Sequence, residues 1–454
     1  MILERVLNMK KILFIMTKPL KQIKQDFKFA HIADSHIGGW RDLRIRELTN
    51  LAFERAVDTC LNEGVDFVII AGDLFNTALP GIDSMNLVTK KLFELKNAGV
   101  RVYAVPGSHD YSPSGKTFLS TLEKAGLLVN LARAEFNEET QKLVLKPTVD
   151  EETGTILFGM IGRRNSLEKN YFEILDYESI NKDIKKHRSN FQDSLSIFVF
   201  HSAISELNPS DLYKLESISV NQLPKNFDYY AAGHVHVVIN EKIGDKLIVY
   251  PGPLFPNNFS ELEKLKSGGF FIVSVSNGNI VSVDYKQVRV KNVFSISINA
   301  DNKTPSQVTS EILDVISDKE FYDTIVLLRV EGLLSSGKPS DVDFKRIIDL
   351  LYERGAFFVM KNTYNLKSPD FEGVKVVVSN TEDVENKIID ENVKGVFGLN
   401  KDETKEFVKQ LMGLLSKEQV DGETKRTFEL RLNSEFDTLL EKLFTDVVDE
   451  SSNN

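Results

Sequence analysis

The sequence predicts an α/β protein in which two sheets face each other and helices cover their outer faces. Over residues 27–132, short apolar runs alternate with amphipathic stretches, which is typical of parallel strands joined by right-handed helical crossovers. Residues 66–71 read DFVIIA, a continuous apolar run typical of a strand that is buried on both faces. Residues 140–290 consist mainly of short apolar segments of strand length, which favours a second sheet.

The first part shows a regular order of elements. In chain order we expect a strand over 27–33, a helix over 43–62, a strand over 66–71, a helix over 83–97, a strand over 101–105 and a helix over 117–125. The helix at 43–62 places Ile45, Leu48 and Ala52 on one side, and Gly126 ends the last helix.

The later parts follow different patterns. Strands are expected over 154–161, 196–201, 229–232, 246–250, 270–275 and 281–285, with one helical segment over 171–188. From residue 294 a small α/β unit runs strand, helix (305–316), strand (324–330), helix (341–354), strand (356–360). An acidic connector and helical stretches around 404–415 and 434–444 follow.

Length and composition exclude several classes of protein. The 454 residues allow two or three domains, and the single cysteine, Cys60, cannot form an intramolecular disulfide. No apolar run approaches the about 20 residues that a membrane helix needs. We therefore expect a cytoplasmic protein and not a secreted or membrane-spanning one.

The charge is negative overall and unevenly distributed. The net charge is −10, and residues 371–454 hold 19 acidic and 11 basic residues. This balance argues against a histone-like DNA coat. It does not exclude DNA as a substrate, because bound metal ions reverse the local potential of an acidic site.

Most of the seven histidines fall where strands are expected to end. Those at or beside such ends are His36, His109, His201, His234 and His236. Asp34 and Asp73 also follow expected strands, and ligand sites in α/β sheets collect at this edge. Carboxylate and imidazole ligands together suit Mn²⁺, Fe²⁺ or Zn²⁺ better than Ca²⁺. A lone Asp-x-His is more often loop or capping chemistry, whereas five such elements in order point to a metal site.

The same residues carry a resemblance to a known family. The motifs DSH (34–36), AGDLFN (71–76), PGSHD (106–110), FHS (200–202) and GHVH (233–236) resemble the calcineurin-like metallophosphoesterase superfamily. Within it, KFAHIADSHIGG (28–39), VDFVIIAGDLF (65–75) and YPG (250–252) resemble the SbcD-type nuclease subunit of the DNA double-strand-break repair complex. The resemblance implies a four-layer α-β-β-α metallophosphoesterase sandwich with a smaller α/β capping domain and a C-terminal helical tail.

The resemblance also divides the chain and assigns roles to residues. It implies a basic extension over 1–26, a nuclease domain over 27–290, a DNA-recognition capping domain over 291–366 and an acidic tail over 367–454. It implies that Asp34, His36 and His236 hold one metal, that His201 and His234 hold the other, and that Asp73 bridges the two. Ser108 stands where the family has an asparagine ligand. The resemblance further implies that His109 contacts the scissile phosphate and that Asp110 orients the imidazole of His109.

The expected function follows from the resemblance. It implies two divalent ions, with Mn²⁺ preferred, and a nuclease that cuts duplex ends 3′ to 5′ and single strands internally. The implied partners are DNA, an SbcC-like coiled-coil ATPase bound by the tail, and a second copy that pairs through helices 43–62 and 83–97. The expected location is the nucleoid. Two alternatives stay open: a small phosphate ester as substrate, or, because Ser108 and Pro253 depart from the family pattern, a catalytically weakened scaffold for the ATPase.

Other polar and aromatic residues allow two interpretations each. His31 lies inside the first strand and is expected to be a hydrogen-bonded structural histidine. His187, in the run KKHR, is expected on the solvated surface. Arg163 and Arg164 follow a strand and either touch phosphate or pair with nearby Glu, and Trp40 either packs or stacks a base.

Overall fold

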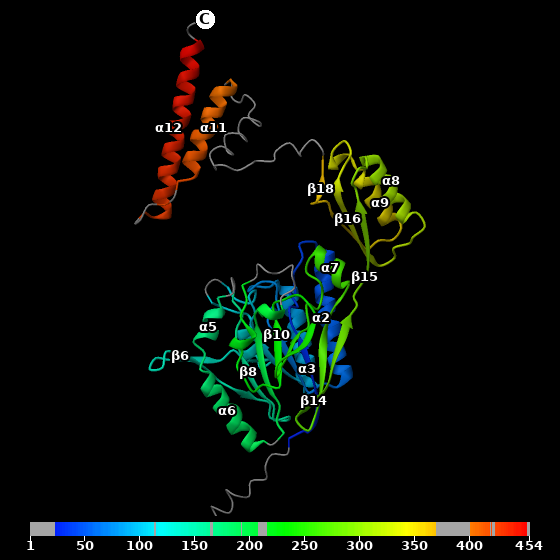
Figure 1. The fold of residues 1–454 in the computed structure, drawn as a ribbon, viewed down its shortest axis with the longest axis vertical. Coiled ribbons are helices and arrows are strands. Elements are labelled where there is room, and N and C mark those ends of the chain that lie inside the picture. The colour runs from blue at the N-terminus through cyan, green and yellow to red at the C-terminus, as the bar shows by residue number, and fades with distance from the viewer. Residues whose placement is uncertain are drawn as a thin grey trace, which may run out of the picture. The chain divides into compact units, whose positions relative to one another are not determined.

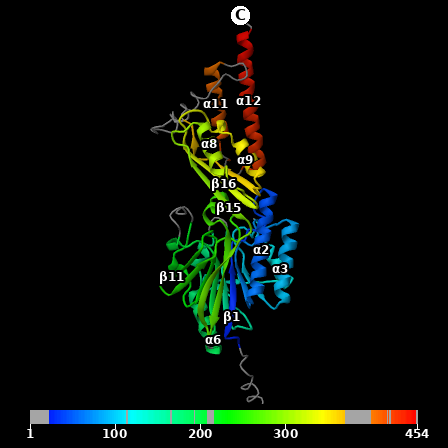
Figure 2. The same ribbon diagram turned by 90° about the vertical axis from the view of Figure 1, so that its right-hand side faces the viewer.

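The chain forms two compact units, residues Met1–Ser368 and Pro369–Asn454. The structure is a computed structural model. It describes residues 23–112, 115–163, 167–191, 193–207, 216–368, 400–417, 419 and 423–451. Most of the basic extension expected at the N-terminus, Arg164 and the acidic connector lie outside these described residues. Figures 1 and 2 show the ribbon in two views.

The first sheet has six strands in the order β14-β13-β1-β2-β3-β4. Their bounds are β1 Asp26–Ile32, β2 Phe67–Ala71, β3 Arg101–Val105, β4 Val129–Asn130, β13 Gly268–Ser276 and β14 Asn279–Val288. Strands β1 to β4 are parallel, while β13 runs antiparallel to both β1 and β14.

The second sheet also has six strands, in the order β11-β12-β10-β9-β8-β7. Their bounds are β7 Thr148–Val149, β8 Ile156–Gly159, β9 Ser196–His201, β10 Tyr229–Gly233, β11 Ile239–Ile243 and β12 Lys246–Tyr250. The central strands are parallel, and the edge strands β7 and β11 are antiparallel to their neighbours.

Helices cover the outer face of each sheet, so the expected four-layer sandwich is confirmed (Figure 1). The helices are α2 Leu43–Glu63, α3 Ile82–Asn97 and α4 Leu119–Lys124 on the first sheet, and α5 Lys169–Glu173 and α6 Tyr177–Asn190 on the second. Both faces of strand β2 are buried, which explains its continuous apolar sequence. Phe67 and Ile69 pack between the two sheets, whereas Val68 and Ile70 pack against the helices.

A smaller α/β domain follows the sandwich within the first unit. Its elements are β15 Asn292–Asn299, α8 Pro305–Ile316, β16 Thr324–Leu333, the 3₁₀ turn η5 Pro339–Asp341, α9 Phe344–Glu353, β17 Phe358–Asn362 and β18 Leu366–Lys367. Its strands are parallel, and one face of its sheet packs on α8 and α9. From the other face, Ile325 and Leu327 join the core around α2.

Several short elements complete the first unit. They are the hairpin β5 Ala134–Asn137 and β6 Lys142–Leu145, the 3₁₀ turns η2 Ser205–Leu207 and η4 Val220–Gln222, and α7 Phe259–Leu265. The single helix expected over 171–188 is wrong, since α5 and α6 are separate. The placement of His187 on the solvated surface is wrong too: its side chain is buried, and its ring Nε2 lies 2.7 Å from the Gly154 carbonyl oxygen.

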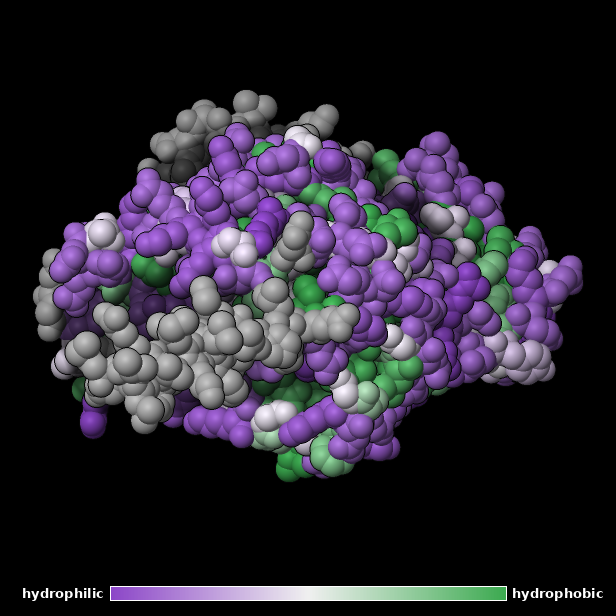
Figure 3. All heavy atoms as spheres, turned by 90° about the horizontal axis from the view of Figure 1, so that it is seen from below, coloured by the Kyte–Doolittle hydropathy of each residue, from purple (hydrophilic) through white to green (hydrophobic). Residues whose placement is uncertain are grey.

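In the part of the second unit that the structure describes, helix α11 Lys401–Leu415 contacts helix α12 Lys425–Ser451. Asn400 caps α11 by accepting from two backbone amides, and Leu414 is buried. Lys417 pairs with Glu435 of α12 at 2.7 Å. No helix among the described residues is long and apolar enough to cross a membrane. The face of the molecule in Figure 3 is largely hydrophilic, with small apolar areas between polar ones.

Candidate metal centre

The predicted site residues come together at the carboxyl ends of parallel strands from both sheets. Asp34 and His36 follow β1, Asp73 follows β2, and His201 is the last residue of β9. The remaining members of the set follow the ends of β3 and β10: Ser108, His109, Asp110, His234 and His236. Facing sheets therefore bring segments about 200 residues apart in the chain into contact, as in the 3.0 Å approach of His36 to His236.

Among the described residues, three groups of side chains could each hold a metal ion. They are Asp34, His36 and His236; Asp34, Asp73 and His201; and His36, Asp73 and His109, and within each group the ligand atoms lie within 4.8 Å of one another. The first group is the set expected to hold one metal. Asp34 and Asp73 each belong to two groups, so two neighbouring ions could share carboxylates.

His234 lies beside these groups without joining one. Its ring centroid is 5.0 Å from that of His201, and its Nε2 is buried without a hydrogen-bond partner among the described residues. Its backbone N–H donates to Asp34 Oδ1 at 3.0 Å. A buried imidazole nitrogen without a partner is costly unless something else satisfies it, and a cation would do so.

Oxygen acceptors fix the orientation of three imidazoles. Nδ1 of His201 lies 2.9 Å from the Ala71 carbonyl oxygen, and Nδ1 of His109 lies 2.8 Å from that of Asn76. Since a carbonyl oxygen only accepts, each Nδ1 carries a proton, and in the neutral imidazole the lone pair is on Nε2, where a metal can bind. His236 is held in the same way by the Glu261 carboxylate, with Nδ1 2.9 Å from Oε1. Such outer partners orient metal-binding histidines.

Sequence reasoning missed Glu261. Its position three residues after Asn258, whose side chain accepts from the Glu261 amide at 2.9 Å, is the pattern of a helix start. That pattern could have located α7. It could not have shown that the carboxylate reaches a histidine that follows a different strand.

Ser108 and Asp110 contact the centre in different ways. The Ser108 hydroxyl donates to Asp73 Oδ2 at 3.2 Å. Asp110 accepts from the backbone amides of Gly107 at 2.9 Å and Phe75 at 3.2 Å. Asp110 therefore ties two loops together. The acceptor at Nδ1 of His109 is Asn76 and not Asp110, so the expected orienting role of Asp110 is not supported.

The backbone at the centre is unusual. Asp34, His36, Asp73 and His234 all have positive φ, between 42° and 98°. Non-glycine residues with this conformation are uncommon and cluster at functional sites. Gly72 permits the close approach of strands here, because a Cβ at this position would lie 2.1 Å from Nδ1 of His201.

Burial and neighbouring charge separate the ionisation behaviour of the site groups. Burial lowers the pKa of His36 and of His234 to about 3, so both imidazoles are neutral and could each offer a lone pair to a metal ion. Burial opposes charge on His201, but the carboxylates of Asp73 and Asp34 outweigh it and raise the pKa of His201 to about 10. Burial would raise the pKa of Asp73, yet His201 and His36 hold it well below its usual range. The centre therefore favours positive charge beside Asp73, as a divalent cation supplies.

Most of the residues for which the sequence allowed two interpretations pack or form hydrogen bonds within the protein. His31 is buried, with Nδ1 3.0 Å from the Tyr229 hydroxyl, which confirms the structural reading. Trp40 packs on the core, and its indole N–H donates to the Pro256 carbonyl oxygen at 3.1 Å. The guanidinium of Arg163 donates to the Tyr171 hydroxyl at 2.8 Å.

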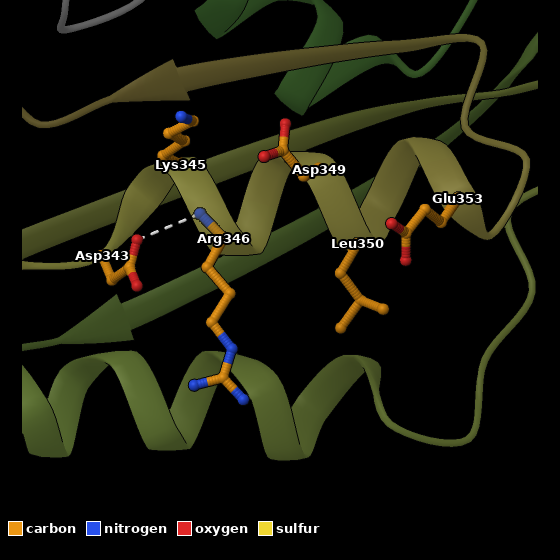
Figure 4. Close-up of a pocket in the computed structure, with 6 residues that line it drawn as sticks. All are labelled: Asp343, Lys345, Arg346, Asp349, Leu350 and Glu353. Carbon is orange, nitrogen blue, oxygen red and sulfur yellow. Dashed lines mark hydrogen bonds between the residues drawn. The ribbon is translucent and has the colours of Figure 1, made fainter.

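A separate hollow lies on the smaller domain, along α9 (Figure 4). It is lined by Asp343, Lys345, Arg346, Asp349, Leu350 and Glu353. Three acidic and two basic side chains nearly cancel, so the hollow does not favour a polyanion.

Part of the chain is similar to known proteins. Residues 27–238 match the family model described as calcineurin-like phosphoesterase, so this part of the chain is similar to that family. The DNA double-strand break repair protein Mre11 of Methanopyrus kandleri is 30% identical over 278 residues. That match covers 59% of this chain and 58% of the relative.

Two further similarities extend the comparison. The DNA double-strand break repair protein Mre11 of Archaeoglobus fulgidus is 26% identical, over 72% of this chain and 74% of that protein. Among solved structures, a dimetal phosphatase from Danio rerio aligns with 58% of this chain and 100% of that chain, at 13% identity and a TM-score of 0.35.

Proposed function

We propose that this chain is a two-metal phosphodiesterase that cuts DNA during double-strand-break repair. The observation that carries the proposal is the sharing of Asp34 and Asp73 between adjacent ligand groups. A shared carboxylate can hold two ions close together, as phosphoryl displacement at paired metals requires. DNA as the substrate is supported by relatives named DNA double-strand break repair proteins, which are 22–30% identical.

Each residue has a part in the proposed reaction. Two divalent cations, proposed to be Mn²⁺, supply charge neutralisation at the phosphate and a water of lowered pKa. Asp34, His36 and His236 would hold one cation, His201 and His234 would hold the other, and Asp73 would be shared between the two. His109, fixed through Nδ1, presents Nε2 to the bound phosphate, and in its imidazolium form it would deliver the Nε2 proton to the leaving oxygen.

Partners and cleavage modes also belong to the proposal. Large apolar side chains are exposed on α2 and α3, among them Leu43, Ile82 and Phe93, which supports a homodimer through these helices. The helices of the second unit are proposed to bind an SbcC-like ATPase. With it, the protein would digest duplex ends 3′ to 5′ and cut single strands internally, acting on the nucleoid.

The test combines metal analysis with two kinds of substrate. Purified protein loaded with Mn²⁺ should nick plasmid DNA and show much weaker hydrolysis of a nucleotide panel. Asp73→Asn should abolish nicking and lower metal stoichiometry while near-ultraviolet circular dichroism stays unchanged, because it weakens both groups that share Asp73.

Other results would support the alternatives. Near-wild-type nicking by Asp73→Asn would rule out the two-metal assignment. Nucleotide hydrolysis without nicking would indicate a small-ester phosphatase. Bound metal without turnover on either substrate would indicate a scaffold.

A further inference from the structure

Helix α7 contacts the metal centre on one side. Glu261 accepts from Nδ1 of His236 at 2.9 Å, and both side chains are mostly buried, with 17% and 22% of their surface exposed. Glu261 is itself fixed by the backbone amide of Asn257 at 2.7 Å and by the side chain of Asn258. The position of α7 therefore sets the position of the carboxylate that orients His236.

The same helix contacts the smaller domain on its other side. Arg329 of β16 forms a bidentate ion pair with Glu263, with Nη2 2.6 Å from Oε2 and Nε 3.0 Å from Oε1. Its guanidinium also lies over the ring of Phe259, 5.1 Å from the centroid. Planar, two-point contacts of this kind fix direction as well as distance.

The spacing of these residues explains how one short helix serves two partners. Successive residues of a helix are 100° apart, so Glu261 and Glu263 point in nearly opposite directions. Leu262 lies between them and is fully buried in the core that Leu254 and Phe270 also line. The helix is thus anchored at its middle and held at both sides.

We propose that α7 couples the docking of the smaller domain to metal affinity. Glu261 is a positioning residue for His236, and Arg329 is a positioning residue for α7 through Glu263. When the smaller domain shifts, Arg329 moves Glu263, the helix tilts about Leu262, and the hydrogen bond to His236 weakens. The inference rests on the proposed metal centre and adds a route by which the smaller domain regulates it.

The experiment measures Mn²⁺ binding by titration calorimetry on metal-free, full-length protein without DNA. Glu261→Ala should weaken Mn²⁺ binding about 10- to 100-fold, as loss of an outer partner of a metal-binding histidine does. Glu261→Gln keeps an oxygen acceptor for Nδ1 and should restore most of the affinity. A purely structural role for Glu261 would not give this rescue.

Arg329 is tested in the same assay. Arg329→Ala should weaken Mn²⁺ binding about two- to fivefold, in the range of a partly exposed ion pair. Arg329→Lys, which keeps the charge and loses the two-point contact, serves if the alanine variant fails to fold. Lys303→Ala is the matched control, because it breaks the 2.5 Å pair with Glu311 in the same domain and leaves Arg329 and Glu263 in place.

The double variant decides whether the two contacts form one path. With Glu261 removed, the loss of Arg329 should cause no further weakening of Mn²⁺ binding. The coupling would be overturned if the double variant weakened Mn²⁺ binding by the product of the two separate effects. It would also be overturned if the Arg329 variant bound Mn²⁺ as tightly as Lys303→Ala does. Wild-type protein that binds Mn²⁺ but cuts no DNA would instead overturn the nuclease function and leave the coupling standing.

Discussion

His109 differs from the other site histidines in its environment. Its backbone amide donates to Asp73 Oδ1 at 2.7 Å, and its ring packs edge-on against His36 with centroids 4.9 Å apart. It lies close enough to form a ligand group with His36 and Asp73, yet it is only partly buried. These contacts allow two roles, that of a metal ligand and that of a group that contacts the substrate.

His109→Ala separates these two roles. We expect this variant to keep its metal content and DNA affinity while turnover falls about 10²- to 10⁴-fold, the usual contribution of a proton-transferring group. Metal analysis and single-turnover cleavage of labelled DNA measure both quantities. A loss of metal equal to the loss of turnover would show that His109 is a ligand.

His31 should make stability depend on pH. Burial lowers its pKa to about 3, against about 6.5 when unfolded, so only the unfolded chain takes up this proton between those values. Stability therefore falls as pH falls from about 6.5 towards 3, by about 1.4 kcal/mol per pH unit for this group. His31→Gln removes the titration.

Chemical denaturation of both proteins from pH 7.5 to 4.5, with chelator present, measures this effect. The free energy of unfolding should fall more steeply with decreasing pH in the wild-type protein than in His31→Gln, by about 1.4 kcal/mol per pH unit. The other buried histidines titrate in both proteins, so the difference between the two curves reports His31 alone. Parallel curves would contradict the prediction.

At the level of elements, the turn after β2 depends on glycine. Gly72 has φ of 88°, and a Cβ there would overlap His201. Gly72→Ala should therefore destabilise the protein by about 1–3 kcal/mol from overpacking alone and displace His201, which lowers metal affinity.

Gly99→Ala is the matched control for that substitution. Gly99 has φ of 80°, but a Cβ there meets nothing within 4 Å. Gly99→Ala should lower the free energy of unfolding by only about 1–2 kcal/mol, the cost of a left-handed backbone at alanine, and should leave Mn²⁺ binding unchanged. Thermal unfolding and calorimetry measure both effects. Equal loss of metal affinity in the two variants would argue against the packing explanation.

The elements also show what sequence patterns can predict. Runs such as residues 66–71 located the buried strands, and polar residues directly after them located most of the side chains that gather at the candidate metal centre. The break between α5 and α6 was not predictable, because Leu143 of the β5–β6 hairpin bonds the backbone of both Ile174 and Asp176. The burial of His187 was missed for a similar reason: its partner, Gly154, lies 33 residues away. Contacts distant in the sequence leave no local pattern.

At the scale of the whole molecule, every residue of the metal centre lies in the unit that ends at Ser368. The second unit is acidic, whereas binding to DNA phosphates favours Lys and Arg side chains. Its helices expose Leu415 and Leu430, with 70% and 60% of their surface accessible, as a partner-binding surface would.

A chain that ends at Ser368 should keep Mn²⁺-dependent cleavage of single-stranded DNA. It should lose co-purification with the ATPase and any ATP-stimulated action on duplex ends, because the proposed docking helices are gone. Pull-down and cleavage assays, with metal content as the control for folding, measure these outcomes. A truncated chain that retains the ATPase at full strength would refute the assignment.

The left-handed backbone at Asp34, His36, Asp73 and His234 has a consequence for protein engineering. Asparagine, aspartate and histidine tolerate this conformation far better than glutamate, cysteine or β-branched residues do. The backbone conformation therefore limits which residue types can replace these four residues, whatever metal is chosen. Attempts to switch the metal preference by exchanging side chains at these four positions should succeed only among those three residue types, and a thiolate site would require rebuilding the loops.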